Sequence, residues 1–313
     1  MKGSYPKHFD GERFFNPGAP QARGFSDVLK WQLSGSHRQR SPEFIDDVNP
    51  SVPPQQVEDL RITLVNHSTV LVQQSGSNIL TDPIWSQRAS PITWAGPKRR
   101  RAPGVKFGDL PPIHTVLLSH NHYDHLDIAT LERLAARGKS TYIVPQGVSP
   151  VLTSKGIGPV YELDWGESGR VEGATIHCVP AMHFSARGLT DRNRTLWCGY
   201  MIDSGNGLVY YAGDTGFGEQ FQWIHERFEA PRLALLPIGA YEPRWFMSPI
   251  HMGPDEAVRA HGIIGARTSI AIHHGTFQLA DEALDTPKHD LAALGQPASF
   301  VVLANGEALH LAW

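Results

Sequence analysis

The sequence predicts an α/β fold in which two β-sheets pack face to face and helices cover their outer sides. From Leu60 onward, short apolar or β-branched segments alternate with a few segments of helical spacing, and turn residues separate them. The chain has 313 residues, of which 41% are hydrophobic and 19% charged, so it can bury a sizeable core. No segment repeats at a fixed period.

The first 56 residues differ in composition from the rest. They are rich in proline, glycine, serine and charged residues, and only Phe25–Leu33 has a pattern that predicts a helix. We therefore expect residues 1–56 to form an extended arm that packs on one larger domain, residues 57–313.

The first half of the larger domain begins with alternating or apolar runs that predict a β-meander. After a Pro-Pro pair, another apolar run predicts a buried strand, and a segment of helical spacing follows. The expected strands are Arg61–Val65, Thr69–Gln73, Asn78–Thr81, Ile113–Ser119 and Thr141–Val144, and the expected helix is Ile128–Arg137.

The second half repeats this alternation. Pro254 suits the first position of a helix, and the acidic Asp255 and Glu256 suit its first turn, where the helix dipole favours negative charge. The expected strands are Thr175–Val179, Leu196–Ile202, Leu208–Ala212, Leu233–Ile238, Ser269–Ile272 and Phe300–Leu303, and the expected helices are Gly218–Phe228 and Pro254–His261.

Charge and cysteine content exclude several classes of partner and compartment. A net charge of −3 gives no global attraction to nucleic acid, so we expect no nucleic-acid partner. Cys178 and Cys198 are too few for a disulfide framework. The polar N-terminus does not resemble a signal peptide, and no apolar run reaches the length of a spanning helix. We expect a cytoplasmic protein, and peripheral contact with the inner membrane surface is compatible with this composition; the sequence indicates no oligomeric state.

Lys98–Arg101 followed by Lys106 is the one strong basic run. Such a run is usually a solvated loop, but it could also meet anionic lipid headgroups, at about 1 kcal/mol per basic residue. Aromatic residues do not alternate with it, which disfavours binding to nucleic acid.

Side chains of the types that bind metal ions follow four of the expected strands. The segment HNHYDH, His120–His125, comes after one strand, and His183, Asp214 and His273 come after three others. A lone histidine is more often a satisfied core or surface residue, but side chains at four strand ends can converge on one point. The expected ligands are His120, His122 and His183 for one ion, Asp124, His125 and His273 for a second, and Asp214 as the bridge. Two Zn²⁺ ions suit these donors, and Mn²⁺ or Fe also would.

At these residues the sequence resembles the metallo-β-lactamase superfamily, whose signature is His-x-His-x-Asp-His. The resemblance implies a four-layer αββα sandwich of two mixed sheets, with the metals at one edge. Within the superfamily the sequence is most similar to the N-acyl-phosphatidylethanolamine-hydrolysing phospholipase D family, over residues 58–313 and more weakly over Phe9–Pro17. The segments that carry this likeness are Thr81–Arg101, Leu110–Asp127, Ala212–Phe217, Pro237–Met247 and Ala271–Phe277.

The resemblance implies the same ligands and a phosphodiesterase of phospholipase D type. Such an enzyme cleaves N-acyl-phosphatidylethanolamine-like lipids to phosphatidic acid and N-acylethanolamine with a metal-bridging hydroxide. True β-lactamases of the superfamily commonly have Cys or His where Asp214 stands, which disfavours a β-lactam substrate. The alternatives are a lactonase, a broad-specificity phosphodiesterase, or a metal-binding protein without catalysis.

The resemblance also suggests residues around the metals. We expect Asp124 and Asp214 to be catalytic, and His251 to be either a proton donor or a structural histidine. Asp82 resembles a carboxylate that orients a ligand imidazole, while no role can be given to His67. The expected substrate-binding residues are Tyr123, Tyr241, Glu242, Arg244 and Trp245, whose apolar members would suit an ordinary core equally well.

Overall fold

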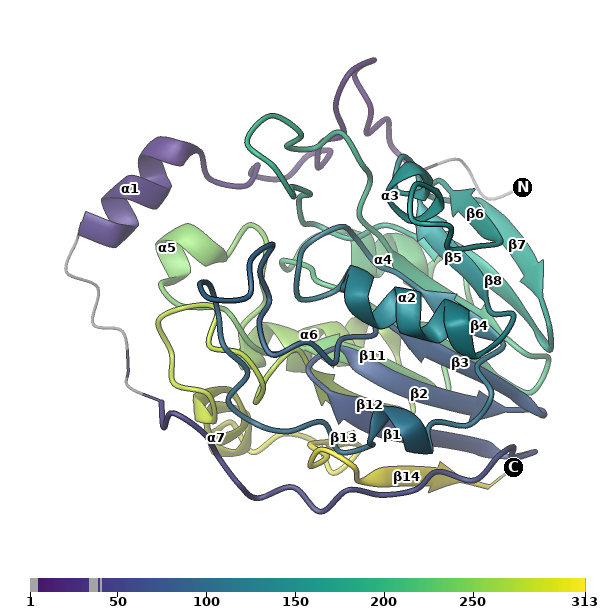
Figure 1. The fold of residues 1–313 in the computed structure, drawn as a ribbon. Helices are drawn as coiled ribbons and strands as arrows, with labels where there is room; N and C mark the ends of the chain where they lie inside the picture. Colours follow the sequence, from purple (N-terminus) through teal and green to yellow (C-terminus); the bar gives the residue numbers. More distant parts are fainter. Residues whose placement is uncertain (1–4, 34–38, 40, 313) are drawn as a thin grey trace.

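The computed structural model describes residues 5–33, 39 and 41–312. Two seven-stranded mixed sheets pack against each other, and helices lie on the outer face of each (Figure 1). The predicted four-layer αββα sandwich is therefore confirmed.

The first sheet has the strand order β14-β1-β2-β3-β4-β5-β6. Its pairs are antiparallel from β14 to β3 and parallel from β3 to β6. The strands are β1 Leu60–Asn66, β2 Thr69–Gln74, β3 Ser77–Thr81, β4 Thr115–Leu117, β5 Thr141–Pro145, β6 Val160–Leu163 and β14 Ala308–Leu311. Helices α2 (Ile128–Arg137) and α3 (Ser149–Thr153) cover its outer face, and a 3₁₀ turn, η1 (Phe107–Asp109), precedes β4.

The second sheet has the order β13-β12-β11-β10-β9-β8-β7. Its pairs are parallel from β13 to β10 and antiparallel from β10 to β7. The strands are β7 Ser168–Val171, β8 Ala174–Val179, β9 Gly199–Asp203, β10 Leu208–Tyr211, β11 Leu233–Pro237, β12 Thr268–Ile272 and β13 Phe300–Val301. Helices α4 (Gln220–His225), α6 (Pro254–Ile264) and α7 (Thr286–Ala293) cover it, and α5 (Arg244–Met247) lies between β11 and α6 in the chain.

Side chains of the central strands point alternately to the core between the sheets and to the outer helices, and the apolar ones bury both faces. In β11, Leu233 and Leu235 point into the core between the sheets, whereas Ala234 and Leu236 point toward the helices. Successive side chains of a strand face opposite sides, so an uninterrupted apolar run serves both layers at once.

Most expected elements are present, and α1 (Phe25–Leu33) and α2 have the predicted bounds. The expected strand at 196–202 begins only at Gly199, because Leu196 and Cys198 donate their N–H groups to the carbonyls of Gln146 and Ser119 instead of continuing the strand. The expected strand at 113–119 shortens to β4, and α4 is shorter than predicted at both ends. The elements that we did not expect are η1, α3, α5, α7, β6, β7 and β14.

The described part of the arm contacts the sandwich at several points. Phe14 is buried in the core between the sheets. The Asn16 side chain is 2% exposed; its amide donates to the His183 carbonyl (2.9 Å) and its carbonyl accepts from Trp197 Nε1 (3.0 Å). The division of the chain at residues 56 and 57 stays a prediction. None of the helices in the described ranges has both the length and the apolar composition that a bilayer-spanning helix requires.

Candidate metal centre

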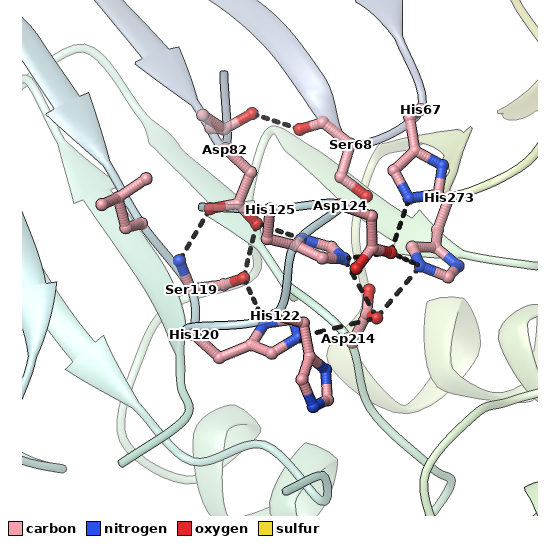
Figure 2. A network of polar contacts seen from close by, with 12 residues as sticks. His67, Ser68, Asp82, Ser119, His120, His122, Asp124, His125, Asp214 and His273 are labelled. Carbon is pink, nitrogen blue, oxygen red and sulfur yellow. Dashed lines mark hydrogen bonds and ion pairs between the residues drawn. The ribbon is translucent and has the colours of Figure 1, made fainter. Parts of the chain in front are cut away.

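All seven predicted ligand side chains lie in one cluster at the edge of the two sheets. Figure 2 labels all of them except His183. His120 follows β4 of the first sheet, whereas His183, Asp214 and His273 follow β8, β10 and β12 of the second. Strands β8, β10 and β12 run in the same direction, so their carboxyl ends meet at the same edge.

Three histidines of the cluster direct ring nitrogens at one point. His120 Nε2 and His183 Nε2 lie 2.8 and 3.2 Å from His122 Nδ1. The Ile250 carbonyl accepts from His183 Nδ1 (2.9 Å), and Ser119 Oγ, which donates to Asp82, accepts from His120 Nδ1 (2.9 Å). These bonds place the protons on the outer nitrogens, so two lone pairs face the point that His122 Nδ1 also faces.

The second group combines carboxylates with imidazoles. Asp124 Oδ2 lies 3.2 Å from His125 Nε2 and 3.4 Å from His273 Nε2. Asp214 Oδ2 lies 3.1 and 3.0 Å from the same two nitrogens, and 4.0 Å from His120 Nε2. Asp214 therefore stands between the two groups, where the sequence placed the bridging ligand.

The Asp82 carboxylate holds the His125 ring and the Ser119 side chain in place through hydrogen bonds. The residue is fully buried, and its Oδ2 accepts hydrogen bonds from His125 Nδ1, Ser119 Oγ and Tyr211 Oη, each at 2.5 Å. Its Oδ1 accepts from the Ser119 N–H (2.7 Å). A carboxylate on the outer nitrogen fixes the ring and the tautomer of His125, which leaves Nε2 free to act as a ligand.

His67 is the residue at this site whose role sequence reasoning missed. It is 1% exposed, and its Nε2 lies 3.0 Å from Asp124 Oδ2. Its backbone carbonyl accepts from the His273 N–H (3.0 Å), and its own N–H donates to Thr276 Oγ1 (3.0 Å). The only local signal was a polar Asn-His-Ser-Thr stretch between two apolar strands, which does not reveal these partners.

The two groups differ in their electrostatics. Burial, followed by neighbouring imidazoles, lowers the pKa of His122 to about 3. Burial likewise lowers the pKa of His183 to about 4, so this group is neutral. Burial acts in the same direction on His273, but the carboxylates of Asp214 and Asp124 outweigh it and raise the pKa to about 9. The second group is thus a set of ion pairs.

The residues present fit two divalent cations. The buried atom Asp214 Oδ1 has no hydrogen-bond partner among the described residues. Buried polar atoms are normally paired, so an unpaired carboxylate oxygen among converging imidazole nitrogens and carboxylate oxygens indicates a place for cations. Neutral imidazole and carboxylate are ligands for zinc, manganese and iron.

His251 lies at the same cluster. It is 8% exposed, its Nδ1 is 4.0 Å from Asp214 Oδ2, and its ring stacks on His273 at 5.2 Å. Nδ1 forms no hydrogen bond within the described chain, and burial lowers the pKa well below its ordinary value. The structure therefore brings His251 beside the predicted ligands.

The predicted substrate residues fall into two environments. Tyr123, half-buried beside His122, donates to the Arg187 carbonyl (2.8 Å) and lines a cavity of about 850 Å³. Tyr241 is buried, and its hydroxyl donates to Asp290.

The other three predicted substrate residues belong to the α5 region. Glu242 accepts from the Arg244 N–H (3.1 Å), and Arg244 pairs with Glu256 (2.6 Å) at the start of α6. Trp245 is 40% exposed on the surface. In the contacts of the described residues, none of these three side chains forms a hydrogen bond or ion pair with a predicted metal ligand, so their substrate role stays a prediction.

The structure divides the basic run, in which Lys98 is exposed and Arg100 half-buried while the other two members lie inside the protein. Arg99 is 1% exposed and donates to the carbonyls of Ser86 and Ile84, and Arg101 is 6% exposed and pairs with Asp47 and Asp285. Two of the four basic side chains in this run therefore lie inside the protein, where they donate hydrogen bonds to carbonyl and carboxylate oxygens of the loops.

Comparisons with known proteins identify the family. A family model described as "Beta-lactamase superfamily domain" matches residues 77–274. N-acyl-phosphatidylethanolamine-hydrolyzing phospholipase D 1 of Caenorhabditis elegans is 38% identical over 275 residues, 82% of this chain and 77% of that protein. The mitochondrial enzyme of that name from Saccharomyces cerevisiae is also 38% identical, over 72% of this chain and 50% of its own length.

One more distant relative supports the same class, and one solved structure supports the fold. A metal-dependent hydrolase of Methanopyrus kandleri is 32% identical over 80% of this chain and 99% of that protein. The solved structure of Igni18, a metallo hydrolase from Ignicoccus hospitalis, superposes with a TM-score of 0.61 at 24% identity, over 81% of this chain and 99% of that one. The chain thus belongs to the β-lactamase superfamily as a metal-dependent hydrolase, and is related to the N-acyl-phosphatidylethanolamine-hydrolysing phospholipases D.

Proposed function

We propose that the protein is a zinc-dependent phosphodiesterase of phospholipase D type that hydrolyses N-acyl-phosphatidylethanolamine-like lipids. The products would be a phosphatidic acid and an N-acylethanolamine. The observation that carries the proposal is Asp214 Oδ2, which lies within 4.0 Å of nitrogens from both histidine groups and so suits a shared ligand. The worm and yeast relatives, which are named for this reaction, support the choice of substrate.

In this proposal the side chains hold two metals in two sets. His120, His122 and His183 hold one; Asp124, His125 and His273 hold the other; Asp214 serves both. When bound, such ions polarise a phosphoryl oxygen and lower the pKa of a water molecule toward neutrality. Two dications and two carboxylates leave a net charge of +2, which attracts an anionic phosphodiester.

The remaining groups position the reacting atoms. Asp82 fixes the ring of His125, and through Ser119 it also fixes that of His120. Burial keeps His251 neutral, and a neutral imidazole is a weak acid. We therefore assign His251 the donation of a hydrogen bond to the leaving oxygen, rather than the transfer of a full proton.

Asp214→Asn tests this function. The change removes the shared negative charge, and because even residues behind the ligands alter activity by about 10- to 100-fold, we expect kcat to fall by at least about 100-fold. Release of N-acylethanolamine from a detergent-dispersed N-acyl-phosphatidylethanolamine is the assay, with metal content measured in parallel. Asp203→Asn is the matched control, since Asp203 ends β9 and accepts only a local N–H from Gly205 (2.8 Å) in the contacts described.

The assay also separates the alternatives. A lactone and bis(p-nitrophenyl) phosphate are tested beside the lipid, with zinc, manganese and iron each supplied in turn. Turnover of the lactone without turnover of the lipid by fully loaded protein would contradict the phospholipase assignment. Full activity of Asp214→Asn would contradict the shared-ligand arrangement itself.

A further inference from the structure

Helix α1 is apolar on two opposite sides. Val28 and Trp31 face the protein, where the Trp31 ring stacks on Phe246 at a centroid distance of 5.0 Å. Leu29 and Leu33, one helical turn apart, are 49% and 75% exposed. At 100° per residue these two leucines lie on the side opposite to Val28 and Trp31. The outward side of α1 therefore presents apolar groups that the rest of the described chain does not cover.

Three further side chains extend this surface. Trp245 of α5 is 40% exposed, and Lys30 Nζ lies 5.3 Å above its ring. Arg23 Nε donates to the Trp245 carbonyl (3.2 Å). We call these five residues, Arg23, Leu29, Lys30, Leu33 and Trp245, the outer patch. Leucine and tryptophan beside lysine and arginine is the composition of helices that lie in the interface of an anionic membrane.

The outer patch lies directly over the layer that supports the candidate metal centre. Beneath α1 is an apolar cluster that includes Phe246 and Ile250, with Phe184 packed against it. The Ile250 carbonyl accepts from His183 Nδ1, and the Phe184 ring meets the His122 ring edge-on at 4.5 Å. The cluster thus connects the inward side of α1 to residues that contact His122 and His183, while the two leucines of the outer patch lie on the far side of that helix. Figure 1 shows α1 beside α5, apart from the sheets themselves.

We propose that the outer patch docks on the surface of an anionic phospholipid bilayer, so that a lipid reaches the metal centre without leaving the membrane. The leucines and Trp245 would enter the headgroup boundary, while Lys30 and Arg23 meet phosphate oxygens. This inference rests on the proposed function, because it gives the outer patch the role of bringing a lipid substrate to the metal centre. It also moves the membrane contact away from Lys98–Arg101, whose buried members cannot reach headgroups.

Vesicle sedimentation of the full chain tests the docking. The vesicles are phosphatidylcholine alone or with about one third phosphatidylglycerol, and no N-acylated lipid is added. We expect the wild-type chain to prefer the anionic vesicles. Leu29→Glu with Leu33→Glu should weaken binding to them by about tenfold or more, since it replaces inserted apolar groups by repelled charges. Lys30→Glu should weaken binding by about tenfold on anionic vesicles and barely on neutral ones.

Leu294→Glu is the matched control, because Leu294 is 51% exposed and follows α7, which Figure 1 shows well away from α1. We expect it to bind like wild type. If the wild-type protein hydrolyses bis(p-nitrophenyl) phosphate, all variants should do so at the wild-type rate, which confirms their fold. If it does not, circular dichroism confirms the fold of each variant.

The docking would be overturned if Leu294→Glu weakened vesicle binding as much as the α1 variants do, or if the α1 variants bound as tightly as wild type. It would also be overturned if the wild-type chain bound neither kind of vesicle. A patch that instead pairs two copies of the chain would reveal itself as a dimer that dissociates in Leu29→Glu, Leu33→Glu without any vesicle binding. The proposed function can fail separately from the docking. A chain that binds vesicles but does not hydrolyse the lipid would contradict the function and leave the docking. A chain that hydrolyses detergent-dispersed lipid but does not bind vesicles would contradict the docking and leave the function.

Discussion

At the scale of single residues, the site depends on backbone conformations that the sequence does not predict. His67, Asp82 and His273 have positive φ values of 49°, 32° and 57°, in the left-handed region that non-glycine residues rarely enter. Each such residue costs on the order of 1–3 kcal/mol and persists only where surrounding contacts hold it. Here the contacts are the hydrogen bonds that join these residues to Asp124, to Ser119 and to each other.

Replacing His67 by alanine tests its share in this network. The change removes the partner 3.0 Å from Asp124 Oδ2 but leaves the proposed ligands in place. We expect the affinity of the Asp124 site to fall by about 10- to 100-fold, as for other residues that orient ligands, while the site of His120, His122 and His183 is retained. Competition with a chromophoric chelator measures both affinities.

The matched control for His67 is His177→Ala. His177 is a half-buried histidine of β8 that packs against Phe228 at 5.3 Å, away from the cluster, and its loss should leave both affinities unchanged. If His67→Ala also keeps two metals bound at wild-type affinity, His67 has no part in holding Asp124.

At the scale of elements, the loops after the strands decide where ligands point, and Gly213 shows how. It precedes Asp214 with φ of +62°, and a Cβ there would lie 2.8 Å from both the Ser119 Cβ and the Cys198 carbonyl oxygen. Gly213→Ala should therefore displace the loop and Asp214 with it. We expect loss of metal together with a lower free energy of unfolding, measured by elemental analysis and by urea denaturation.

Gly205→Ala separates the clash from the backbone strain. Gly205 also has a positive φ, +80°, but an added Cβ meets nothing within 4 Å. Its replacement should cost about 1–2 kcal/mol of stability through φ alone and keep the metals. Equal metal loss in both variants would show that strain, not the contact with Ser119, is responsible.

The N-terminal arm is an element whose docking should depend on pH. His8 stacks on Trp165 at 4.2 Å, and its Nε2 lies 2.7 Å from Asp164 Oδ1. Burial opposes protonation, but the hydrogen bond and charge of Asp164 outweigh it and raise the pKa of His8 above 6.5. A raised pKa means that this stabilisation is present at pH values below 6.5 and fades as pH rises through the folded-state value.

We therefore expect faster hydrogen exchange in the arm at pH 8.5 than at pH 6, after correction for the intrinsic pH dependence of exchange. His8→Phe keeps the ring stack without a titratable group, and should remove the difference. An arm whose corrected exchange is the same at both pH values would exclude His8 as its pH-dependent anchor.

At the scale of the whole molecule, the sequence predicted what alternation and strand ends encode. Apolar strands such as β11, buried on both faces, were found, because their pattern is continuous. Strands β6 and β7 were not, because Val160–Leu163 and Ser168–Val171 are largely exposed and lack that pattern. Helix α7 is short, and only Pro287 and Leu291 in it are buried, which leaves a faint helical period.

The site divides in the same way. The structure brings the seven predicted ligand side chains together, since each is of a metal-binding type and lies beyond the end of a strand; that they bind metal stays a prediction. His67 was given no role, and neither interpretation of Lys98–Arg101 included the burial of Arg99 and Arg101, because both features depend on partners far along the chain: Asp124 for the one, Ser86, Asp47 and Asp285 for the other. Long-range pairing of polar groups leaves no local period in a sequence.

The candidate centre also joins the two sheets, which predicts how metal removal affects the whole molecule. His120 comes from the first sheet, and His183, Asp214 and His273 come from the second, so ions held between them cross-link both halves of the sandwich. A ligand present at 1,000 times its dissociation constant stabilises the folded state by about 4 kcal/mol. Chelation should therefore lower Tm by several degrees, measured by calorimetry with the bound metal quantified. Asp214→Asn should show a smaller difference, because the link between the groups is already cut. An identical Tm for loaded and stripped wild-type protein would mean that the ions do not tie the sheets together.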